Sequence, residues 1–328
     1  MKNLKRPKFK FAAIGDEAGA SIERQIAGLL ELGWKHIELR DVDRINIAAL
    51  DDDAFDQVCD ALETNGIQVC GIGSQIANWS RDANGDLEKD LRDAECLIPR
   101  MLRLNAPYVR IMSYKIDGDA SIKDLKVDKR IKNLKIICQR FLDAGIKPLH
   151  ENCFNYGGLG VQQTMELVEQ VPGLGLIFDT GNPLLSPDLT QAGPPYPRQN
   201  TWAVWEQVRD YVCHVHIKDS VCYGELPQKL NFMATEYVFP GSGDGDVARI
   251  LNDLIRRDYN GIVSIEPHVG AVYHDTGIQQ KAEWDAQFRM FINYGRRLME
   301  LLQGAYPTAD LELLNAATRI ALPASECD

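Results

Sequence analysis

Hydrophobic positions along the chain fall into two alternating patterns. Short runs of β-branched and other apolar residues, bounded by turn residues, are typical of buried strands, whereas apolar residues spaced three or four apart are typical of amphipathic helices. The short runs predict eight strands, at Phe9–Ile14, His36–Arg40, Gln68–Ser74, Tyr108–Met112, Lys147–Glu151, Leu174–Asp179, Val212–Lys218 and Ile262–Glu266. The longer stretches predict eight helices, at Ile22–Leu32, Asp53–Thr64, Leu87–Leu104, Ser121–Ala144, Gln162–Gln170, Trp202–Arg209, Asp246–Arg257 and Lys281–Leu302.

This regular alternation predicts an α/β protein with a parallel sheet. Eight units are the number that closes a (β/α)8 TIM barrel. A doubly wound open sheet is the alternative, but eight regular units without a glycine-rich nucleotide loop favour the barrel. We expect residues 1–304 to form the barrel as the catalytic domain, and residues 305–328 to form a short C-terminal extension that packs on it.

The loops predict which end of the barrel carries the chemistry. Turns from helix to strand are short, and several contain a glycine that suits the end of a helix, as at Gly33, Gly145 and Gly173. Loops from strand to helix are longer, above all residues 182–200 and 219–245. Because long loops at the carboxyl ends of the strands build the active face of such a barrel, we expect the site there.

Composition and charge exclude several classes of protein. With 45% hydrophobic and 25% charged residues, the chain is neither disordered nor a coiled coil. Its net charge of −11 disfavours nucleic acid as a partner. No apolar run is long enough for a membrane span or a secretory signal. The eight cysteines form no C-x-x-C pair and most lie in apolar runs, so we expect reduced core thiols in a cytoplasmic protein.

Four consecutive predicted strands end in an acid or a histidine inside an otherwise apolar run. These residues are Glu151, Asp179, His216 and Glu266. A charged group at the end of a buried strand is costly unless it is paired or bound to a metal, and three converging carboxylates repel one another. One divalent cation removes that conflict. The oxygen-rich set suits Mn²⁺ first, with Mg²⁺ or Co²⁺ as alternatives, better than structural zinc.

The alternative interpretation is that each acid caps a helix or pairs with a basic neighbour such as Lys218, Arg110 or Arg40. That is as plausible as metal binding for any single acid, but the coincidence at four successive strands favours the metal site. His150 alternates away from Glu151, and it is a candidate base if the strand bends at its end.

Further polar and aromatic residues near the predicted strand ends are candidates for substrate binding. Glu38 and Arg40 share one face of their strand, as do His216 and Lys218 and also Glu266 and His268. Fixed polar groups beside an aromatic wall are common in sugar sites. The candidates by this criterion are Glu38, Arg40, Ser74, Trp79, Arg110, Lys218 and His268.

Seven segments in this order resemble one known family. They are Ile37-Glu38-Leu39-Arg40, Gly71-Ile72-Gly73-Ser74, His150-Glu151-Asn152, Phe178-Asp179-Thr180-Gly181-Asn182, His216-Ile217-Lys218-Asp219, Gly241-Ser242-Gly243-Asp244-Gly245 and Glu266-Pro267-His268. Over about residues 9–304, the chain is similar to the xylose isomerase-like TIM barrels, which include sugar and sugar phosphate isomerases and epimerases.

The resemblance implies one divalent metal held by Glu151, Asp179, His216 and Glu266, with Glu151 and Glu266 able to shuttle protons. Asn182 stands where related epimerases often have a substrate-binding histidine, so we expect it to contact substrate. Some relatives with the Glu-Pro-His ending are large subunits of enzymes that cleave 3-keto-C-glycosides together with a small second subunit. A homo-oligomer or a small accessory subunit is therefore expected as partner.

The combined features predict a metal-dependent enzyme that removes an α proton from a keto-sugar to give a metal-stabilised enediolate, as an isomerase or epimerase. The main alternative is that the enzyme eliminates a leaving group and so acts as a carbon–carbon lyase on 3-keto-glycosides. An abasic-site endonuclease needs about three metals and a basic groove, which six histidines and the acidic charge disfavour. A non-catalytic sugar-binding protein is disfavoured because all four ligand positions are filled.

Overall fold

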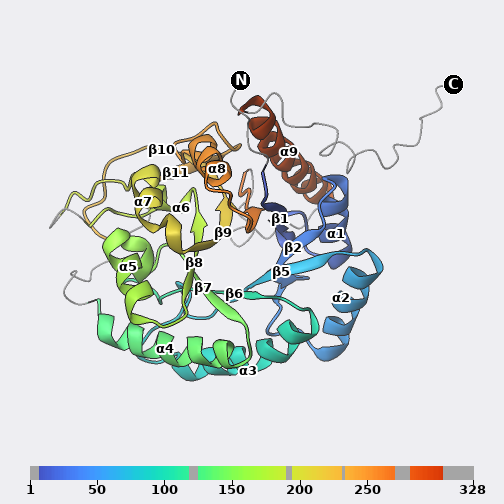
Figure 1. The fold of residues 1–328 in the computed structure, drawn as a ribbon, viewed down its shortest axis with the longest axis horizontal. Coiled ribbons are helices and arrows are strands. Elements are labelled where there is room, and N and C mark those ends of the chain that lie inside the picture. The colour runs from blue at the N-terminus through green and yellow to red at the C-terminus, as the bar shows by residue number, and fades with distance from the viewer. Residues whose placement is uncertain (1–6, 118–124, 190–193, 231–232, 270–280, 306–328) are drawn as a thin grey trace.

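The computed structural model describes residues 7–117, 125–189, 194–230, 233–269 and 281–305. Eight parallel strands close into a barrel in the order β1-β12-β9-β8-β7-β6-β5-β2, with the first strand paired to the last (Figure 1). The barrel strands are β1 (Lys10–Ile14), β2 (His36–Leu39), β5 (Gln68–Gly73), β6 (Tyr108–Ile111), β7 (Lys147–Glu151), β8 (Gly175–Asp179), β9 (Val212–Ile217) and β12 (Ile262–Ile265). The predicted TIM barrel is confirmed.

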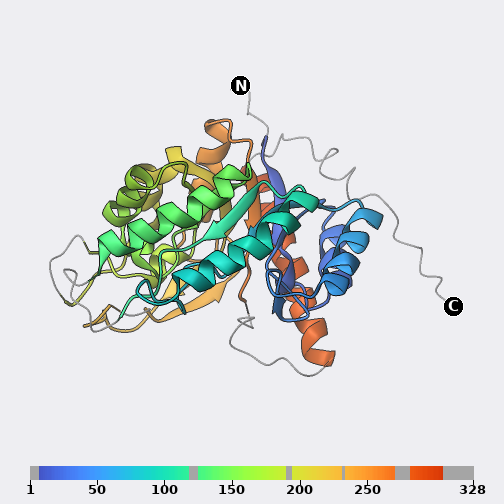
Figure 2. The same cartoon turned by 90° about the horizontal axis from the view of Figure 1, so that it is seen from below.

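Helices form an outer ring around the sheet, as two views at right angles show (Figures 1 and 2). The barrel helices are α1 (Ile22–Glu31), α2 (Asp52–Thr64), α3 (Leu87–Arg103), α4 (Val127–Asp143), α5 (Val161–Gln170), α7 (Thr201–Val208), α8 (Val247–Arg256) and α9 (Lys281–Ala305). Each barrel helix overlaps a predicted one. The short helix α6 (Asn182–Leu185) was not predicted. Of the C-terminal extension expected at 305–328, Ala305 is the last residue of α9, and 306–328 lie outside the described residues.

Two small hairpins extend the barrel at the carboxyl ends of its strands. The first pairs β3 (Asp41–Val42) with β4 (Ile45–Asn46), and the second pairs β10 (Asp219–Cys222) with β11 (Thr235–Val238). The second hairpin lies inside the segment 219–245 that the sequence indicated only as a long loop. Its strands are short and polar, so the hydrophobic pattern gave no signal for them.

Alternation along the strands separates two environments. Outward-facing residues such as Ala13, Ile37, Val215 and Val263 join one continuous hydrophobic core between sheet and helices. Inward-facing residues alternate with them, and at the amino-terminal end of the barrel they form a small separate apolar cluster of Ala12, Cys70 and Ile262. Above this cluster the inward-facing positions include buried charged and polar residues such as Glu38, His216 and Ser264. The charged side chains therefore lie toward the carboxyl ends of the strands.

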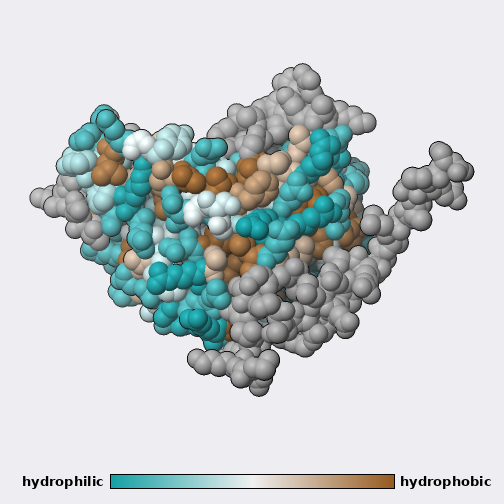
Figure 3. Space-filling model, turned by 90° about the horizontal axis from the view of Figure 1, so that it is seen from above, coloured by the Kyte–Doolittle hydropathy of each residue, from teal (hydrophilic) through white to brown (hydrophobic). Residues whose placement is uncertain are grey.

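The surface is mostly hydrophilic, with hydrophobic side chains gathered into a few patches on the face shown in Figure 3. Within the described ranges, no helix combines the length and apolarity that a membrane crossing requires. The seven cysteines of the described chain are all free thiols, but only Cys70 and Cys138 are buried, so the expectation that most are core thiols is wrong. A cytoplasmic location stays a prediction.

Candidate metal centre

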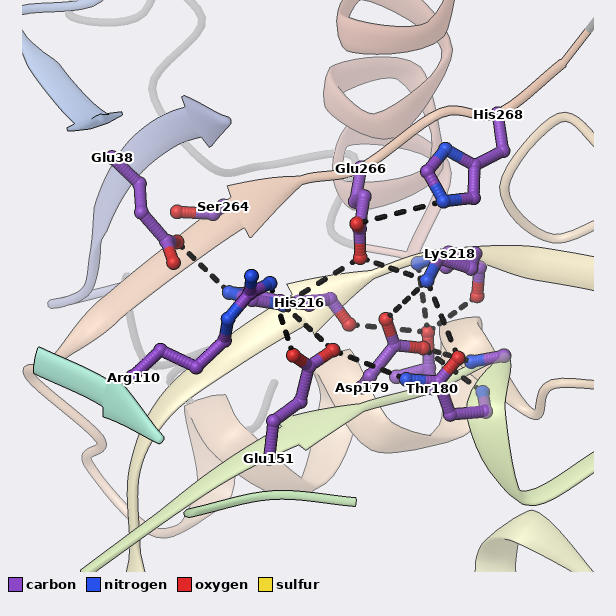
Figure 4. Close-up of polar contacts among 12 residues, drawn as sticks. Glu38, Arg110, Glu151, Asp179, Thr180, His216, Lys218, Ser264, Glu266 and His268 are labelled. Atoms are coloured by element: carbon purple, nitrogen blue, oxygen red, sulfur yellow. Dashed lines mark hydrogen bonds and ion pairs between the residues drawn. The ribbon is translucent and has the colours of Figure 1, made fainter. Parts of the chain in front are cut away.

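The four predicted ligands converge inside the mouth of the barrel, each brought there by its own strand or strand end. Glu151 and Asp179 end β7 and β8, His216 lies near the end of β9, and Glu266 directly follows β12 (Figure 4). Because β7, β8, β9 and β12 are neighbours in the sheet, their carboxyl ends meet on one arc of the rim. All four side chains are buried, with at most 3% of each residue exposed.

The donor set fits a divalent cation. One possible ligand atom from each of Glu151, Asp179, His216 and Glu266 lies within 4.8 Å of the other three. Among the described residues, four buried atoms of this set receive no hydrogen bond: Glu151 Oε2, Asp179 Oδ2, His216 Nδ1 and Glu266 Oε2. Three carboxylates and one imidazole match an ion such as Mn²⁺ or Mg²⁺. The geometry therefore supports the four-ligand prediction.

The basic neighbours named in the alternative interpretation also form ion pairs with these acids. Arg110 Nη1 lies 3.1 Å from Glu151 Oε2. Lys218 Nζ lies 2.9 Å from Asp179 Oδ2 and 2.8 Å from Glu266 Oε2. A carboxylate has two oxygens with about four lone-pair directions, so an ion pair does not exhaust it. Metal binding and these ion pairs are compatible, and the pairs orient the ligands.

The local electrostatics favour positive charge at the centre of the group. Burial raises the pKa of Asp179 to about 6, and the nearby Lys218 ammonium offsets only part of that rise. For His216, burial favours the neutral ring, but Glu38 and Glu151 outweigh it and raise its pKa to about 10. A ring that attracts a proton this strongly lies in a negative potential, which a metal ion would equally satisfy.

Glu38 supports His216 from below rather than facing the mouth as a substrate contact. Its Oε2 lies 2.8 Å from His216 Nε2 and 3.1 Å from His214 Nε2, and His214 Nε2 also lies 2.9 Å from Ser264 Oγ. When Nε2 of His216 donates its proton to Glu38, Nδ1 keeps its lone pair directed at the carboxylates. This is the usual arrangement of a carboxylate behind a metal-binding histidine.

Replacing Glu38 by Gln is expected to raise the Kd for Mn²⁺ by about 10- to 100-fold, because an amide holds the His216 ring less firmly in this tautomer. Isothermal titration of the metal-free protein measures this change. Glu63→Gln, at an exposed position in α2, is the matched control and should leave the Kd unchanged. An unchanged Kd in the Glu38 variant would contradict the supporting role.

Arg40 and His268 belong to a second layer of charge beside Glu266. Arg40 Nη1 lies 3.0 Å from Glu266 Oε1, and its other nitrogens pair with Asp16 and Glu17 at 2.8 Å. His268 Nδ1 lies 3.0 Å from Glu17 Oε1, and Nε2 lies 3.5 Å from Glu266 Oε1. Arg40 and His268 thus meet the predicted ligand Glu266, which keeps both as candidates for substrate contact at the rim.

Asn182 also lies beside the ligands, and its role as a substrate contact stays a prediction. Its Nδ2 donates to Glu151 Oε1 at 3.1 Å, and its Oδ1 lies 3.3 Å from Lys218 Nζ. The strand-end turn is fixed because Asp179 Oδ1 accepts from the backbone N–H groups of Gly181 and Asn182 at 2.8 and 2.9 Å. This turn leaves Asp179 Oδ2 directed at the centre.

His150 lies outside the group. Because it alternates with Glu151, it points outward to the helices, where Nε2 lies 3.0 Å from Ser113 Oγ and 2.9 Å from Asn155 Oδ1. Burial lowers the pKa of His150 to about 4, so the ring is neutral at pH 7. The strand does not bend as a role in catalysis would require, and this placement does not support His150 as a base.

Two further candidates are placed away from the ligands. Ser74 Oγ donates to the carbonyl of Arg110 at 2.5 Å and accepts from the N–H of Ile76 at 3.2 Å, so it joins the ends of β5 and β6. Trp79 lies in the loop after β5 with 39% of its surface exposed. Neither has a described contact with the four ligands, so both stay predictions as substrate contacts.

Three residues at the site were missed from the sequence. Asp16 and Glu17 lie in the short 3-10 helix Gly15–Glu17 that follows β1, so the criterion of acids near strand ends finds them when it is applied to the first strand as well. Tyr237 lies on β11, and its ring centroid is 5.1 Å from that of His268. No sequence signal indicated Tyr237, because its hairpin was not predicted.

This closed eight-stranded barrel, with buried acids and a histidine at the carboxyl ends of its strands, defines a TIM-barrel protein with a candidate divalent metal centre. The family model of the xylose isomerase-like TIM barrels matches residues 26–293, so the chain belongs to this family. No curated protein sequence matches the chain.

Similar solved structures share the fold at low sequence identity. One is a xylose isomerase-like TIM barrel protein from Mycobacterium smegmatis in complex with magnesium, at TM-score 0.61 and 17% identity over 90% of this chain and 98% of that one. Another is a D-tagatose 3-epimerase-like protein, with a TM-score of 0.63 and 17% sequence identity over 91% of this chain and 99% of that one. A third is 3-keto-D-glucoside 4-epimerase from E. coli in its apo form, with a TM-score of 0.57 and 15% sequence identity over 91% of this chain and 100% of that one.

Proposed function

We propose that the protein is a divalent-metal-dependent enzyme that isomerises or epimerises a keto-sugar or a sugar derivative by removal of an α proton. The observation that carries this proposal is the convergence of one buried possible ligand atom from each of Glu151, Asp179, His216 and Glu266, all within 4.8 Å of one another. Membership of the xylose isomerase-like family and the names of the similar epimerases support the same class of reaction.

The protein supplies the acid–base groups and their orientation. Glu151, Asp179, His216 and Glu266 would hold a metal ion, Mn²⁺ by preference, and such an ion would supply Lewis acidity to a substrate carbonyl and its neighbouring hydroxyl, so that the adjacent C–H bond would become more acidic. Glu151 and Glu266 lie on the same group of ligands, 3.6 and 3.7 Å from His216 Nδ1, so one carboxylate can remove a proton while the other returns one. Arg110 and Lys218 hold these carboxylates in place.

The protein also keeps water from the reacting atoms. All the acids and bases of the centre are buried at the rim, and Asn182 and Lys218 fix the oxygen atoms on the side of Asp179. In such a desolvated site, charge that develops on a substrate oxygen is stabilised more strongly than in water. Return of the proton to the neighbouring carbon isomerises the sugar, and return to the opposite face epimerises it.

Hydrogen exchange at the α carbon tests the proposal. Mn²⁺-loaded protein is screened against ketohexoses and 3-keto-glucosides in D₂O, and any substrate found is then compared with its α-deuterated form. We expect deuterium at the α carbon or, if the proton is shielded from solvent, a primary isotope effect on kcat. Turnover with neither signal would overturn proton abstraction, and a cleaved glycosidic carbon–carbon bond would assign the lyase outcome instead.

A further inference from the structure

We infer that the substrate is an uncharged sugar or glycoside rather than a phosphorylated one. This inference rests on the proposed function and narrows its substrate class. It follows from two features of the barrel mouth: the glycine-rich loop that could receive an anion is filled by a side chain of the chain itself, and the cations of the site already face carboxylates.

The glycine-rich loop Gly241-Ser242-Gly243-Asp244-Gly245 encloses the carboxylate of Asp219. The backbone N–H groups of Gly241, Gly243 and Gly245 donate to it at 2.8, 3.0 and 3.0 Å, and the N–H of Ser220 adds a fourth hydrogen bond at 3.0 Å. Converging backbone amides of this kind form the usual site for a phosphate group. Here Asp219 occupies that position, one residue beyond Lys218 of the site.

The carboxylate of Asp219 explains why the loop has glycine at positions 243 and 245. A Cβ atom at Gly243 would lie 2.5 Å from Asp219 Oδ1, and one at Gly245 would lie 2.7 Å from the same atom. Real Cβ atoms do not approach so closely, so only glycine lets the loop close over Asp219. The loop is therefore shaped around an internal anion, and an external ligand is not needed to account for its composition.

The charge of the described site points the same way. Its buried acids outnumber its buried cations two to one: Asp16, Glu17, Glu38, Glu151, Asp179 and Glu266 against Arg40, Arg110 and Lys218. Even with one divalent ion bound and one imidazole protonated, these groups carry no surplus positive charge. A phosphate dianion would therefore find no surplus positive charge to bind, whereas the hydroxyl groups of a neutral sugar can donate hydrogen bonds to the carboxylates.

Each cation is also held by two or more groups of the site itself. Lys218 lies between Asp179 and Glu266. Arg40 pairs with Asp16, Glu17 and Glu266, while Arg110 pairs with Glu151 and donates to the carbonyl of Ser74 at 3.4 Å. A phosphate would have to compete with these carboxylates for the cations, and an acid that lost its cation would be left uncompensated.

Matched substrate pairs test the inference on the Mn²⁺-loaded full chain. Each keto-sugar is compared with its terminal phosphate ester, and each 3-keto-glucoside with its 6-phosphate. We expect kcat/KM for the uncharged member to exceed that for the ester by about 100-fold or more, since like charges at a binding site cost several kcal/mol. Equal or faster turnover of the ester would overturn the inference but leave the proposed function intact. If neither member of any pair reacts, the proposed function fails, and the binding experiment below then decides the inference alone.

Binding of inorganic phosphate provides that separate readout. At constant ionic strength, phosphate is expected to leave the melting temperature of the wild-type protein unchanged. It should raise that of Asp219→Ala, in which four amides lose their internal acceptor, but not that of Asp219→Asn, whose side-chain oxygen still accepts. Stabilisation of the wild type by phosphate would overturn the inference, and this arm remains decisive if Asp219→Ala does not fold.

Discussion

Replacing Glu266 by Gln is expected to lower kcat by about 10³-fold or more, because the substitution removes a general acid–base group. The change also removes one negative charge from the ligand set and the counter-charge of Lys218 and Arg40, at 2.8 and 3.0 Å. Gln has nearly the same shape as Glu, so the loss would reflect chemistry rather than packing. Steady-state kinetics on the substrate found by screening measures the effect, with metal content determined in parallel.

Glu300→Gln is the matched control. Glu300 lies on α9 with 61% of its side chain exposed, where it pairs with Arg297 at 3.2 Å, and its replacement should leave kcat within two-fold of wild type. A Glu266→Gln protein that binds metal and keeps more than about a tenth of the wild-type kcat would contradict the acid–base role of Glu266.

Removal of divalent ions by a chelator is expected to abolish turnover, and Mn²⁺ is expected to restore it. The physical reason is the clustering of Glu151, Asp179 and Glu266, whose mutual repulsion a divalent ion relieves. The same ion should stabilise the fold by about 2.7 kcal/mol when its free concentration exceeds the Kd about 100-fold. Activity after dialysis, elemental analysis and thermal unfolding with and without Mn²⁺ measure both effects.

Asp179→Asn provides the comparison for metal restoration. It keeps the side-chain oxygen that accepts from Gly181 and Asn182 but lowers the charge of the ligand set, so Mn²⁺ should restore little activity and give a smaller thermal shift. Full activity of a wild-type sample shown to be free of metal would contradict the metal requirement. Parallel loading with Mg²⁺ and Co²⁺ ranks the ions that the oxygen-rich set accepts.

The barrel could be predicted from the sequence because its strands are buried on both faces. Runs rich in Val and Ile, such as Val212–Ile217 and Ile262–Ile265, therefore show in the hydrophobic pattern, and the helices between the strands show the longer period. The two hairpins could not be predicted. Their strands, as in Asp219–Cys222, are only two to four residues long and carry polar residues, so they give no apolar run.

The candidate ligands could be predicted because a charged residue at the end of an otherwise apolar run is costly to bury and therefore indicates a function. Alternation also assigned Glu151 inward and His150 outward, and the bend that would reverse His150 does not occur. Sequence reasoning could not assign partners across the barrel. That Glu38 lies behind His216, and that Arg40 meets Glu266, depends on closure of the sheet, which leaves β2 only one strand away from β12 and two strands away from β9.

All the candidate ligands come from the last four barrel strands, β7, β8, β9 and β12, or from the residue directly after one of them. The first four barrel strands and their ends supply Glu38, Arg40 and Arg110, which pair with those ligands. Substitutions among these three residues can therefore change which ion is preferred, and how tightly it is held, while the coordinating atoms stay the same.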